Sequence, residues 1–358
     1  MSGDDPDDDP DDEPMTAPTK TPMTRLPPRF PLATLPTPLV PARRLAATGP
    51  GRLLVKRDDL VGFAVAGNKA RALEYLVGAA IDFGARVLVT GGGPGSNFCA
   101  AAAVAARVAD LECELVVWGD PGAAPNMRIA RAAGARILPT GDDDRDAVDV
   151  LVAERAAELS LSGRKAYAVP RGGSTAIGAL GFADAARELV AQLAALDDRP
   201  SAIVLPVGSG GSCAGLLSGL AEAGCPVPVV GVSVSRPPAA VREHVLALAR
   251  QCSVLRGAPP PRPAQLELVD ARGPGFGSLT PQERERCRTA LHTEGFLLDA
   301  TYGAEAFSVA LDLCHDRPGP VVWWHTGGVA AAIDRLGRPE GVPVSTSRPR
   351  LEEGHGTP

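Results

Sequence analysis

The stretch Val-Leu-Val-Thr-Gly-Gly-Gly-Pro-Gly-Ser-Asn, residues 87–97, joins a short β-rich run to a glycine turn and an alanine-rich segment that reaches Val108. Ser96 lies where that segment begins, and a serine hydroxyl at this position caps free backbone amides. A β-branched run, a tight turn and a helix in succession are typical of folds in which helices cover a parallel sheet. This stretch therefore predicts one strand-turn-helix unit of an α/β fold.

The same alternation continues in both directions along the chain. Further β-rich runs are separated by Ala/Leu-rich helical stretches and occupy residues 53–56, 114–118, 136–138, 166–169, 202–205, 229–233 and 321–324. Several of these runs are apolar throughout, as expected for strands that are covered on both faces. We predict an α/β protein with two open, twisted parallel sheets flanked by helices.

The order of these elements predicts two domains. Residues 84–170 read as a self-contained strand-helix succession, which we assign to a small α/β domain. It is inserted into a larger α/β domain made of residues 29–83 and 171–338, and a cleft between two such domains is where ligands usually bind. Residues 1–28 (Asp, Pro and Thr) and 339–358 (Pro, Ser, Arg and Glu) are predicted to be disordered tails.

Composition argues against several classes of protein. The net charge of −6 is due to eight acidic residues among the first 13, and the rest of the chain has 34 acidic and 36 basic residues. Without a basic stripe, nucleic acid is not an expected partner. No apolar run approaches the roughly 20 residues of a membrane helix, so we expect no membrane contact and a cytoplasmic location. Seven scattered cysteines without paired spacing predict neither a disulfide framework nor a metal site.

The segment Gly67-Asn68-Lys69-Ala70-Arg71 opens a stretch whose apolar residues fall at helical spacing. Lys69 is thus predicted at the start of a helix, directly after a glycine turn. A lysine there is well placed to point into a cleft between structural layers. Its ε-amine can form a Schiff base with a carbonyl cofactor, which makes Lys69 the prime candidate for covalent chemistry.

A second glycine-rich loop follows the predicted strand that ends at Val207, and it reads Gly208-Ser209-Gly210-Gly211-Ser212. Small residues let backbone N–H groups converge, and the helix that follows adds the positive end of its dipole. This loop predicts a phosphate-binding cradle. A tight strand-to-helix turn without a ligand is the alternative, because the loop lacks the lysine of a P-loop.

Three further side chains are candidates for chemistry. Ser96 could transfer protons at the reacting carbon while amides of its helix hold a substrate carboxylate, in addition to its capping role. Tyr302 could act as an acid or base if it faces the cleft, and packing is the alternative. Thr326 lies at the carboxyl edge of a sheet, where ligands of open α/β sheets bind, and could hydrogen-bond a ring nitrogen or stabilise a turn. His325 is expected to be packed.

Taken together, these ordered segments resemble the pyridoxal-phosphate enzymes of fold type II (tryptophan synthase β-like), and specifically the D-cysteine desulfhydrase and 1-aminocyclopropane-1-carboxylate (ACC) deaminase family. The resemblance runs from about Pro36 to Gly328. It includes Lys56-Arg57-Asp58-Asp59-Leu60, Gly67-Asn68-Lys69-Ala70-Arg71, Ser96-Asn97, Val169-Pro170-Arg171-Gly172-Gly173-Ser174, Gly178-Ala179-Leu180-Gly181-Phe182, the loop 208–212 and His325-Thr326-Gly327-Gly328.

The resemblance implies pyridoxal 5'-phosphate as cofactor and a homodimer. It implies that Lys69 forms the Schiff base, that Asn68 contacts the phenolic oxygen, that residues 208–212 bind the phosphate and that Thr326 faces the pyridine nitrogen. A hydroxyl at that nitrogen leaves it largely unprotonated, which suits elimination of a β-substituent.

The implied activity is that of a lyase or deaminase acting on a small or modified amino acid. Deprotonation at Cα and β-elimination would give a 2-oxo acid and ammonia. Two alternatives stay open: β- or γ-replacement, cyclisation or epimerisation in a specialised biosynthetic pathway, and a catalytically silent relative that only binds a ligand.

The chain departs from this family's pattern around the substrate. Where the family reads Gln-Ser-Asn-His with an arginine two residues later, this chain has Phe98 and Ala100, and a family tyrosine in a Gly-Tyr-Gly turn is Phe276 here. The Leu and Glu of ACC deaminases are replaced by Thr326 and Gly303, so the desulfhydrase branch is closer. We predict a bulkier or less polar substrate than D-cysteine or ACC. The predicted substrate-binding residues are Ser96, Asn97, Phe98, Phe276 and Tyr302.

Overall fold

The computed structural model describes residues 25–45, 52–122, 124–197 and 199–337, and it contains two sheets. The larger sheet has six strands in the order β1-β2-β10-β7-β8-β9. In that order their bounds are Leu39–Pro41, Leu53–Arg57, Val321–His325, Ala202–Val207, Val229–Ser233 and Leu266–Asp270. All neighbours pair in parallel except β1, which is antiparallel to β2.

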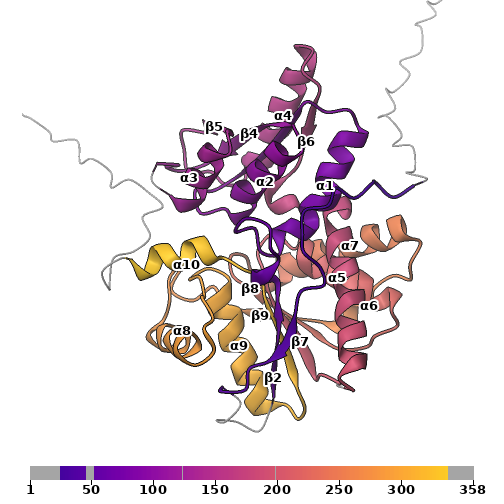
Figure 1. Cartoon of the computed structure of the whole chain (residues 1–358), viewed down its shortest axis with the longest axis vertical. Coiled ribbons are helices and arrows are strands. Elements are labelled where there is room, and N and C mark those ends of the chain that lie inside the picture. Colours follow the sequence, from indigo (N-terminus) through magenta and orange to yellow (C-terminus); the bar gives the residue numbers. More distant parts are fainter. Residues whose placement is uncertain (1–24, 46–51, 123, 198, 338–358) are drawn as a thin grey trace, which may run out of the picture.

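The smaller sheet is fully parallel, with four strands in the order β5-β4-β3-β6. In that order its strands are Arg136–Pro139, Glu112–Val117, Val87–Gly92 and Ala166–Ala168. All four fall within residues 84–170, the segment that we assigned to a small domain. Figure 1 shows this sheet with its helices in the upper half of the molecule and the larger sheet below it.

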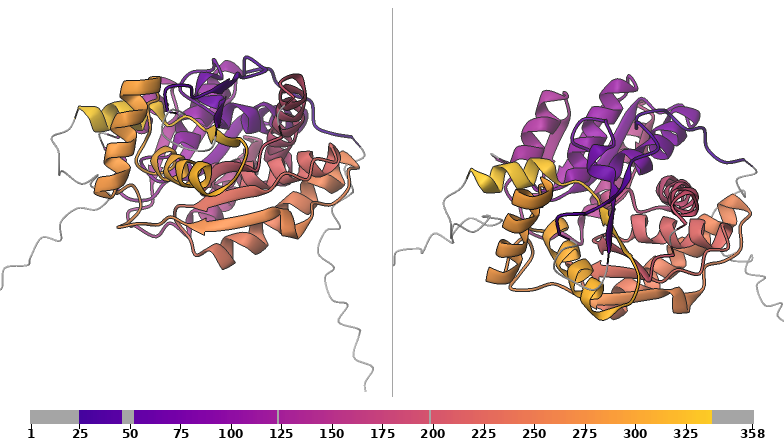
Figure 2. Two further views of the ribbon diagram at one scale, coloured as in Figure 1. Left: turned by 90° about the horizontal axis from the view of Figure 1, so that it is seen from below. Right: turned by 60° about the horizontal axis from the view of Figure 1, so that its bottom comes forward.

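Helices cover both sheets, and Figure 2 shows them on either side of the larger one. From α1 to α10 their bounds are Lys69–Asp82, Asn97–Val108, Pro125–Ala132, Val148–Leu161, Ala176–Ala195, Gly211–Glu222, Pro238–Arg256, Pro281–Glu294, Gly303–Asp316 and Val329–Leu336. Three 3-10 turns, η2 to η4, span Asp58–Leu60, Arg171–Gly173 and Pro263–Gln265. No described helix is long and apolar enough to cross a membrane.

The predicted strands and the α/β architecture are confirmed, with three differences. Strand β3 continues through Gly92, two residues into the predicted glycine turn. Strands β1 and β9 were not predicted, because both lie at sheet edges, where β1 has only half-buried side chains and β9 has a single buried one, Leu266. The pairing of β1 makes the larger sheet mixed rather than purely parallel.

The tails predicted from the sequence fall mostly outside the described residues, which begin at Arg25 and end at Gly337. Residues 25–28, which we assigned to the N-terminal tail, are described and lie against α1. Pro27 is buried, and a Cβ added at Gly78 of α1 would lie 1.7 Å from the carbonyl oxygen of Pro28.

A buried network of charges holds the first turn of α1 against the larger sheet. The Arg71 guanidinium donates to both Asp58 carboxylate oxygens at 2.8 Å and to both Glu188 oxygens at 3.0 Å. Lys56 also donates to Glu188. Because unpaired charges are costly to bury, these side chains depend on one another. The network fixes the helix turn that carries Lys69.

Candidate active site

Lys69 lies at the junction of α1 and the end of β10. The Asn68 N–H donates to the Thr326 carbonyl at 2.9 Å, which ties the start of the helix to the carboxyl edge of the sheet. Gly67 allows this approach because its φ is +54° and a Cβ there would lie 2.2 Å from the Thr326 oxygen. The predicted helix start at Lys69 is confirmed, and the structure brings Lys69 and Thr326 together.

The electrostatic environment of Lys69 favours a reactive amine. Burial lowers the pKa of Lys69 to about 8, and the nearby Asp299 carboxylate opposes that shift. Within the described part of the chain, its ammonium group has no hydrogen-bond or ion-pair partner. A lysine whose charge is disfavoured in this way is suited to nucleophilic and general-base chemistry.

The phosphate loop, residues 208–212, connects β7 to α6 next to Lys69. Asn68 is buried and donates from Nδ2 to the Ser212 hydroxyl at 2.9 Å. Gly210 has a φ of +102°, a conformation that favours glycine. Among the described residues, the backbone N–H groups of Gly210, Ser212 and Cys213 have no acceptor. Three free amides at a helix start form a ready anion-binding site.

Ser174 supports this loop, and we did not predict its role from the sequence. Its hydroxyl donates to the Ser209 hydroxyl at 2.6 Å and accepts from the Gly211 N–H at 3.1 Å. Gly172 in η3 lets the two segments meet, since its φ is +68° and a Cβ there would lie 2.3 Å from Ser209 Oγ. The Gly172-Gly173-Ser174 motif was visible in the sequence, but only the fold shows what it contacts.

The predicted substrate loop, residues 95–98, lies at the start of α2 and follows strand β3 of the smaller sheet. Ser96 is the N-cap, as predicted, and its hydroxyl accepts from the Cys99 N–H at 3.1 Å. The Asn97 carboxamide oxygen accepts from Asn126 Nδ2 at 3.0 Å, and the same Asn126 group donates to the Gly95 carbonyl at 2.8 Å. Asn126, on α3, was not predicted. It fixes the loop in which Ser96 and Asn97 are presented.

Phe98 points away from any open surface. Its side chain is 2% exposed and belongs to the core between α1 and α2. A Cβ at Gly173 would touch both the Phe98 ring, at 2.6 Å, and Leu76, at 2.7 Å. The side chain therefore packs in the core, and its role in binding substrate stays a prediction.

Tyr302 caps α9 and lies beside the phosphate loop. A Cβ at Gly208 would lie 3.0 Å from Tyr302 Cε1 and 3.4 Å from its hydroxyl oxygen. Burial, followed by the Asp299 and Glu305 carboxylates, raises the pKa of Tyr302 well above its usual range. The hydroxyl therefore keeps its proton at neutral pH and is suited to donating it.

Asp299, which we did not single out from the sequence, joins these parts. Its Oδ1 accepts from the Tyr302 N–H at 3.0 Å and from the Gly303 N–H at 2.6 Å. A Cβ at Gly328 would lie 2.7 Å from its Oδ2. Burial raises the pKa of Asp299 to about 6, against these backbone hydrogen bonds. One carboxylate thus contacts the Tyr302 turn and the loop after Thr326.

The remaining predicted residues lie at the edges of this site. Thr326 follows β10 and is half-buried. His325 is buried and stacked on Trp323 at 4.9 Å between ring centroids, and burial lowers its pKa to about 4, so the expectation of a packed histidine is confirmed. Phe276 is 51% exposed and meets the Tyr302 ring edge-on with centroids 6.3 Å apart.

Comparison with known proteins identifies the family to which this chain belongs. The sequence profile of the family described as "Pyridoxal-phosphate dependent enzyme" matches residues 31–327. The chain belongs to this family of pyridoxal-phosphate-dependent enzymes. It is 36% identical to nocardicin C-9' epimerase of Nocardia uniformis subsp. tsuyamanensis, covering 87% of this chain and 95% of that protein. It is 32% identical to D-cysteine desulfhydrase of Salmonella typhi, covering 86% and 96%.

A solved structure supports the same family assignment for this pyridoxal-phosphate enzyme. The crystal structure of an ACC deaminase homologue superposes with a TM-score of 0.81 at 30% identity, covering 86% of this chain and 95% of that one. The fold is therefore fold type II, and the chain is an enzyme of the D-cysteine desulfhydrase and ACC deaminase group.

The residues of the site fit the cofactor of this family. The free amides at the start of α6 suit its phosphate, and the glycines at 172, 208, 210 and 211 leave room where a Cβ would collide with neighbouring side chains. The Lys69 amine suits its aldehyde. Asn68 and Thr326, which are joined through the backbone, are the residues that would face its ring.

Proposed function

We propose that this enzyme removes the Cα proton of an amino acid and expels a β-substituent, which gives a 2-oxo acid and ammonia. The observation that carries the proposal is the Lys69 amine. This amine is half-buried next to the phosphate loop, and burial lowers its pKa to about 8. No described residue forms a hydrogen bond with it. Relatives named D-cysteine desulfhydrase and ACC deaminase homologue support this choice.

The side chains of the site divide the work. Bound pyridoxal phosphate supplies the electron sink that stabilises negative charge at Cα. Lys69, when neutral, accepts the Cα proton, and the N-terminal amides of α2 with Ser96 hold the substrate carboxylate. Tyr302, whose raised pKa keeps it protonated, donates a proton to the leaving group.

Epimerisation at Cα is the second candidate. The relative at 36% identity is named an epimerase, and Lys69 and Tyr302 come from different elements, the starts of α1 and α9. Two groups that approach from different elements can remove a proton on one face and return one on the other. Inversion at Cα needs no leaving group, so it would suit amino acids that lack a β-substituent able to leave.

One experiment separates these reactions. The holoenzyme is incubated in D₂O with a panel of D- and L-amino acids, and products are analysed by chiral chromatography and mass spectrometry. Elimination releases 2-oxo acid and ammonia, whereas epimerisation gives the opposite enantiomer with deuterium at Cα. Absence of deuterium, 2-oxo acid and inversion with every amino acid contradicts both reactions.

We further propose that the enzyme acts as a homodimer, as the resemblance implies, and in the cytoplasm, as expected from the composition. Light scattering of the purified holoenzyme measures its mass, and the mass of a single chain contradicts the dimer.

A further inference from the structure

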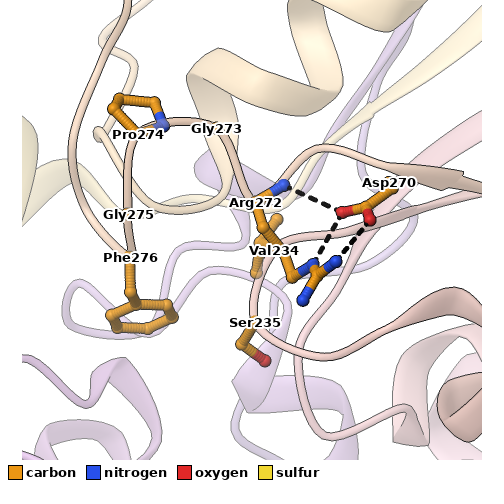
Figure 3. A pocket seen from close by; sticks show the side chains of 8 residues that line it. All are labelled: Val234, Ser235, Asp270, Arg272, Gly273, Pro274, Gly275 and Phe276. Carbon is orange, nitrogen blue, oxygen red and sulfur yellow. Dashed lines mark hydrogen bonds and ion pairs between the residues drawn. The ribbon is translucent and has the colours of Figure 1, made fainter.

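A cavity of about 490 Å³ lies next to Tyr302, whose ring contacts a residue of the cavity wall. It is lined by residues 272–276 and by Val234, Ser235 and Asp270 (Figure 3). Phe276 forms part of its wall and also contacts the Tyr302 ring. Arg272, on the same wall, is paired with Asp270 through two hydrogen bonds of 2.8 and 2.7 Å. A substrate side chain that passes Tyr302 can therefore extend into this space.

Arg236 follows directly after the cavity-lining Ser235. Its Nη2 donates to the Gly208 carbonyl at 2.9 Å, at the first residue of the phosphate loop. Gly208 is also the residue that lies against the Tyr302 ring. The guanidinium thus lies on the Tyr302 side of the loop, whereas the free amides belong to residues 210, 212 and 213.

The charge of Arg236 is not neutralised by the described residues. Its guanidinium has no carboxylate within ion-pair distance, and its pKa is lowered by burial and then by the nearby Arg171 and Arg145. The carboxylates that act on it are Asp146 and Asp149, and Asp149 already binds Arg171 at 3.0 Å. Three arginines thus face two aspartates, which leaves one positive charge in excess.

Arg145 brings a second guanidinium from the segment that carries the smaller sheet. It belongs to the loop before α4 of the small domain, and its Nη2 lies 3.5 Å from the Ser235 carbonyl. Its nearest carboxylate oxygen, on Asp146, is 4.0 Å away, and its side chain is 41% exposed. Its positive charge also acts on Tyr302. The two guanidinium groups therefore flank the route from the active site into the cavity.

We propose that Arg236 and Arg145 bind a carboxylate at the far end of the substrate's side chain, so that the substrates are amino acids whose extended side chain ends in an anionic group. This inference rests on the proposed function, since it names the substrate class of the same site. A planar guanidinium matches a carboxylate in charge and geometry. Pairing would also offset the cost of leaving Arg236 half-buried without a counter-charge.

Binding measured on the holoenzyme tests this assignment. The absorbance change of the bound cofactor is titrated with D- and L-forms of two matched pairs, glutamate with glutamine and 2-aminoadipate with 2-aminohexanoate. We expect the carboxylate-bearing member to bind at least roughly tenfold more tightly. Arg236→Gln should abolish this preference, whereas Arg236→Lys should keep part of it because the charge remains. Arg164→Gln, at a guanidinium paired with Glu112 and outside the cavity lining, should keep it.

Several outcomes overturn the proposal. One is that the unmodified enzyme binds both amino acids of a matched pair with equal affinity. Another is that Arg236→Gln lowers the affinity for both amino acids by the same factor. Loss of bound cofactor in that variant, measured as released pyridoxal phosphate, would assign the guanidinium to the cofactor's phosphate instead. If Arg236→Gln does not fold, Arg145→Gln takes its place, and an unchanged preference there overturns the subsite. A charge preference without any product contradicts the proposed function alone, and no absorbance change with any amino acid overturns both.

Discussion

The cofactor side and the substrate side of this site are built differently. On the cofactor side, Asn68, Ser174 and the phosphate loop are joined by hydrogen bonds, and the glycines between them have no room for a Cβ. On the predicted substrate side, the Phe276 ring is half-exposed on a cavity wall. Interdependent contacts resist substitution, whereas single side chains facing open space can change. From this difference we expect substitutions in the first region to affect cofactor binding and chemistry, and substitutions in the second to affect the choice of substrate.

The largest effect is expected from Lys69→Ala, which removes the reactive group of the cofactor side. Turnover should fall at least roughly thousandfold, because both the covalent attachment and the proton acceptor are lost. The absorbance of lysine-bound cofactor should disappear as well. Lys165→Ala, at a lysine that lies over the Phe83 ring, is the control. An active Lys69→Ala enzyme would contradict the assignment of the chemistry to the cofactor side.

The pKa of the Lys69 amine tests whether the cofactor side changes the reactivity of its lysine. Because an amine is neutral above its pKa, and burial lowers that pKa to about 8, acetylation of Lys69 in cofactor-free protein should speed up tenfold per pH unit and level off near pH 8. At pH 7 the neutral fraction should exceed that of an exposed lysine by roughly 300-fold. Peptide mass spectrometry measures the rate, with free Nα-acetyllysine as reference. A rate that still rises at pH 10 would show that the site does not tune this amine.

Tyr302→Phe tests the boundary between the two sides. The ring and its contact with Phe276 remain, while the proton donor is lost, so turnover should fall roughly hundredfold with cofactor content unchanged. Tyr167→Phe, in the small sheet, controls for loss of a tyrosine hydroxyl. Loss of cofactor from Tyr302→Phe would place this residue on the cofactor side.

The smallest effect is expected from a matched pair of glycine substitutions. Gly172 and Gly163 both have positive φ, +68° and +81°, but only a Cβ at position 172 meets the phosphate loop, 2.3 Å from Ser209 Oγ. Both alanine variants should lose about 1–2 kcal/mol of stability from backbone strain. Only Gly172→Ala should also bind pyridoxal phosphate roughly tenfold more weakly, as measured by equilibrium dialysis. Equal cofactor affinities would show that η3 does not shape the loop.

Features that depend on neighbours in the chain were predictable. The helix start at Lys69, the Ser96 cap and the strand-to-helix position of the phosphate loop all follow from short-range patterns and are present in the structure. Contacts between distant segments were not predictable, because no periodicity links their residues. The bond between Ser174 and Ser209 spans 35 positions, and Asn126 reaches Asn97 across 29.

The position of Phe98 shows what depends on tertiary packing. Its place next to Ser96 and Asn97 predicts contact with substrate, which stays a prediction, and the structure shows the side chain packed in the core near Leu76. Which face of α2 carries position 98 is set by the packing of α2 on α1. That packing involves residues far apart in the chain.

The sequence by itself determined the α/β layers, the lysine at a helix start and the glycine loop that can hold phosphate, because each depends on local backbone preferences and the period of apolar residues. Only the tertiary structure decided that Asp299 lies close to Lys69, that Phe98 is core and that Arg145 comes within 3.5 Å of the Ser235 carbonyl, directly before Arg236. Burial and charge at a site are sums over side chains from many segments. They exist only once the chain is folded.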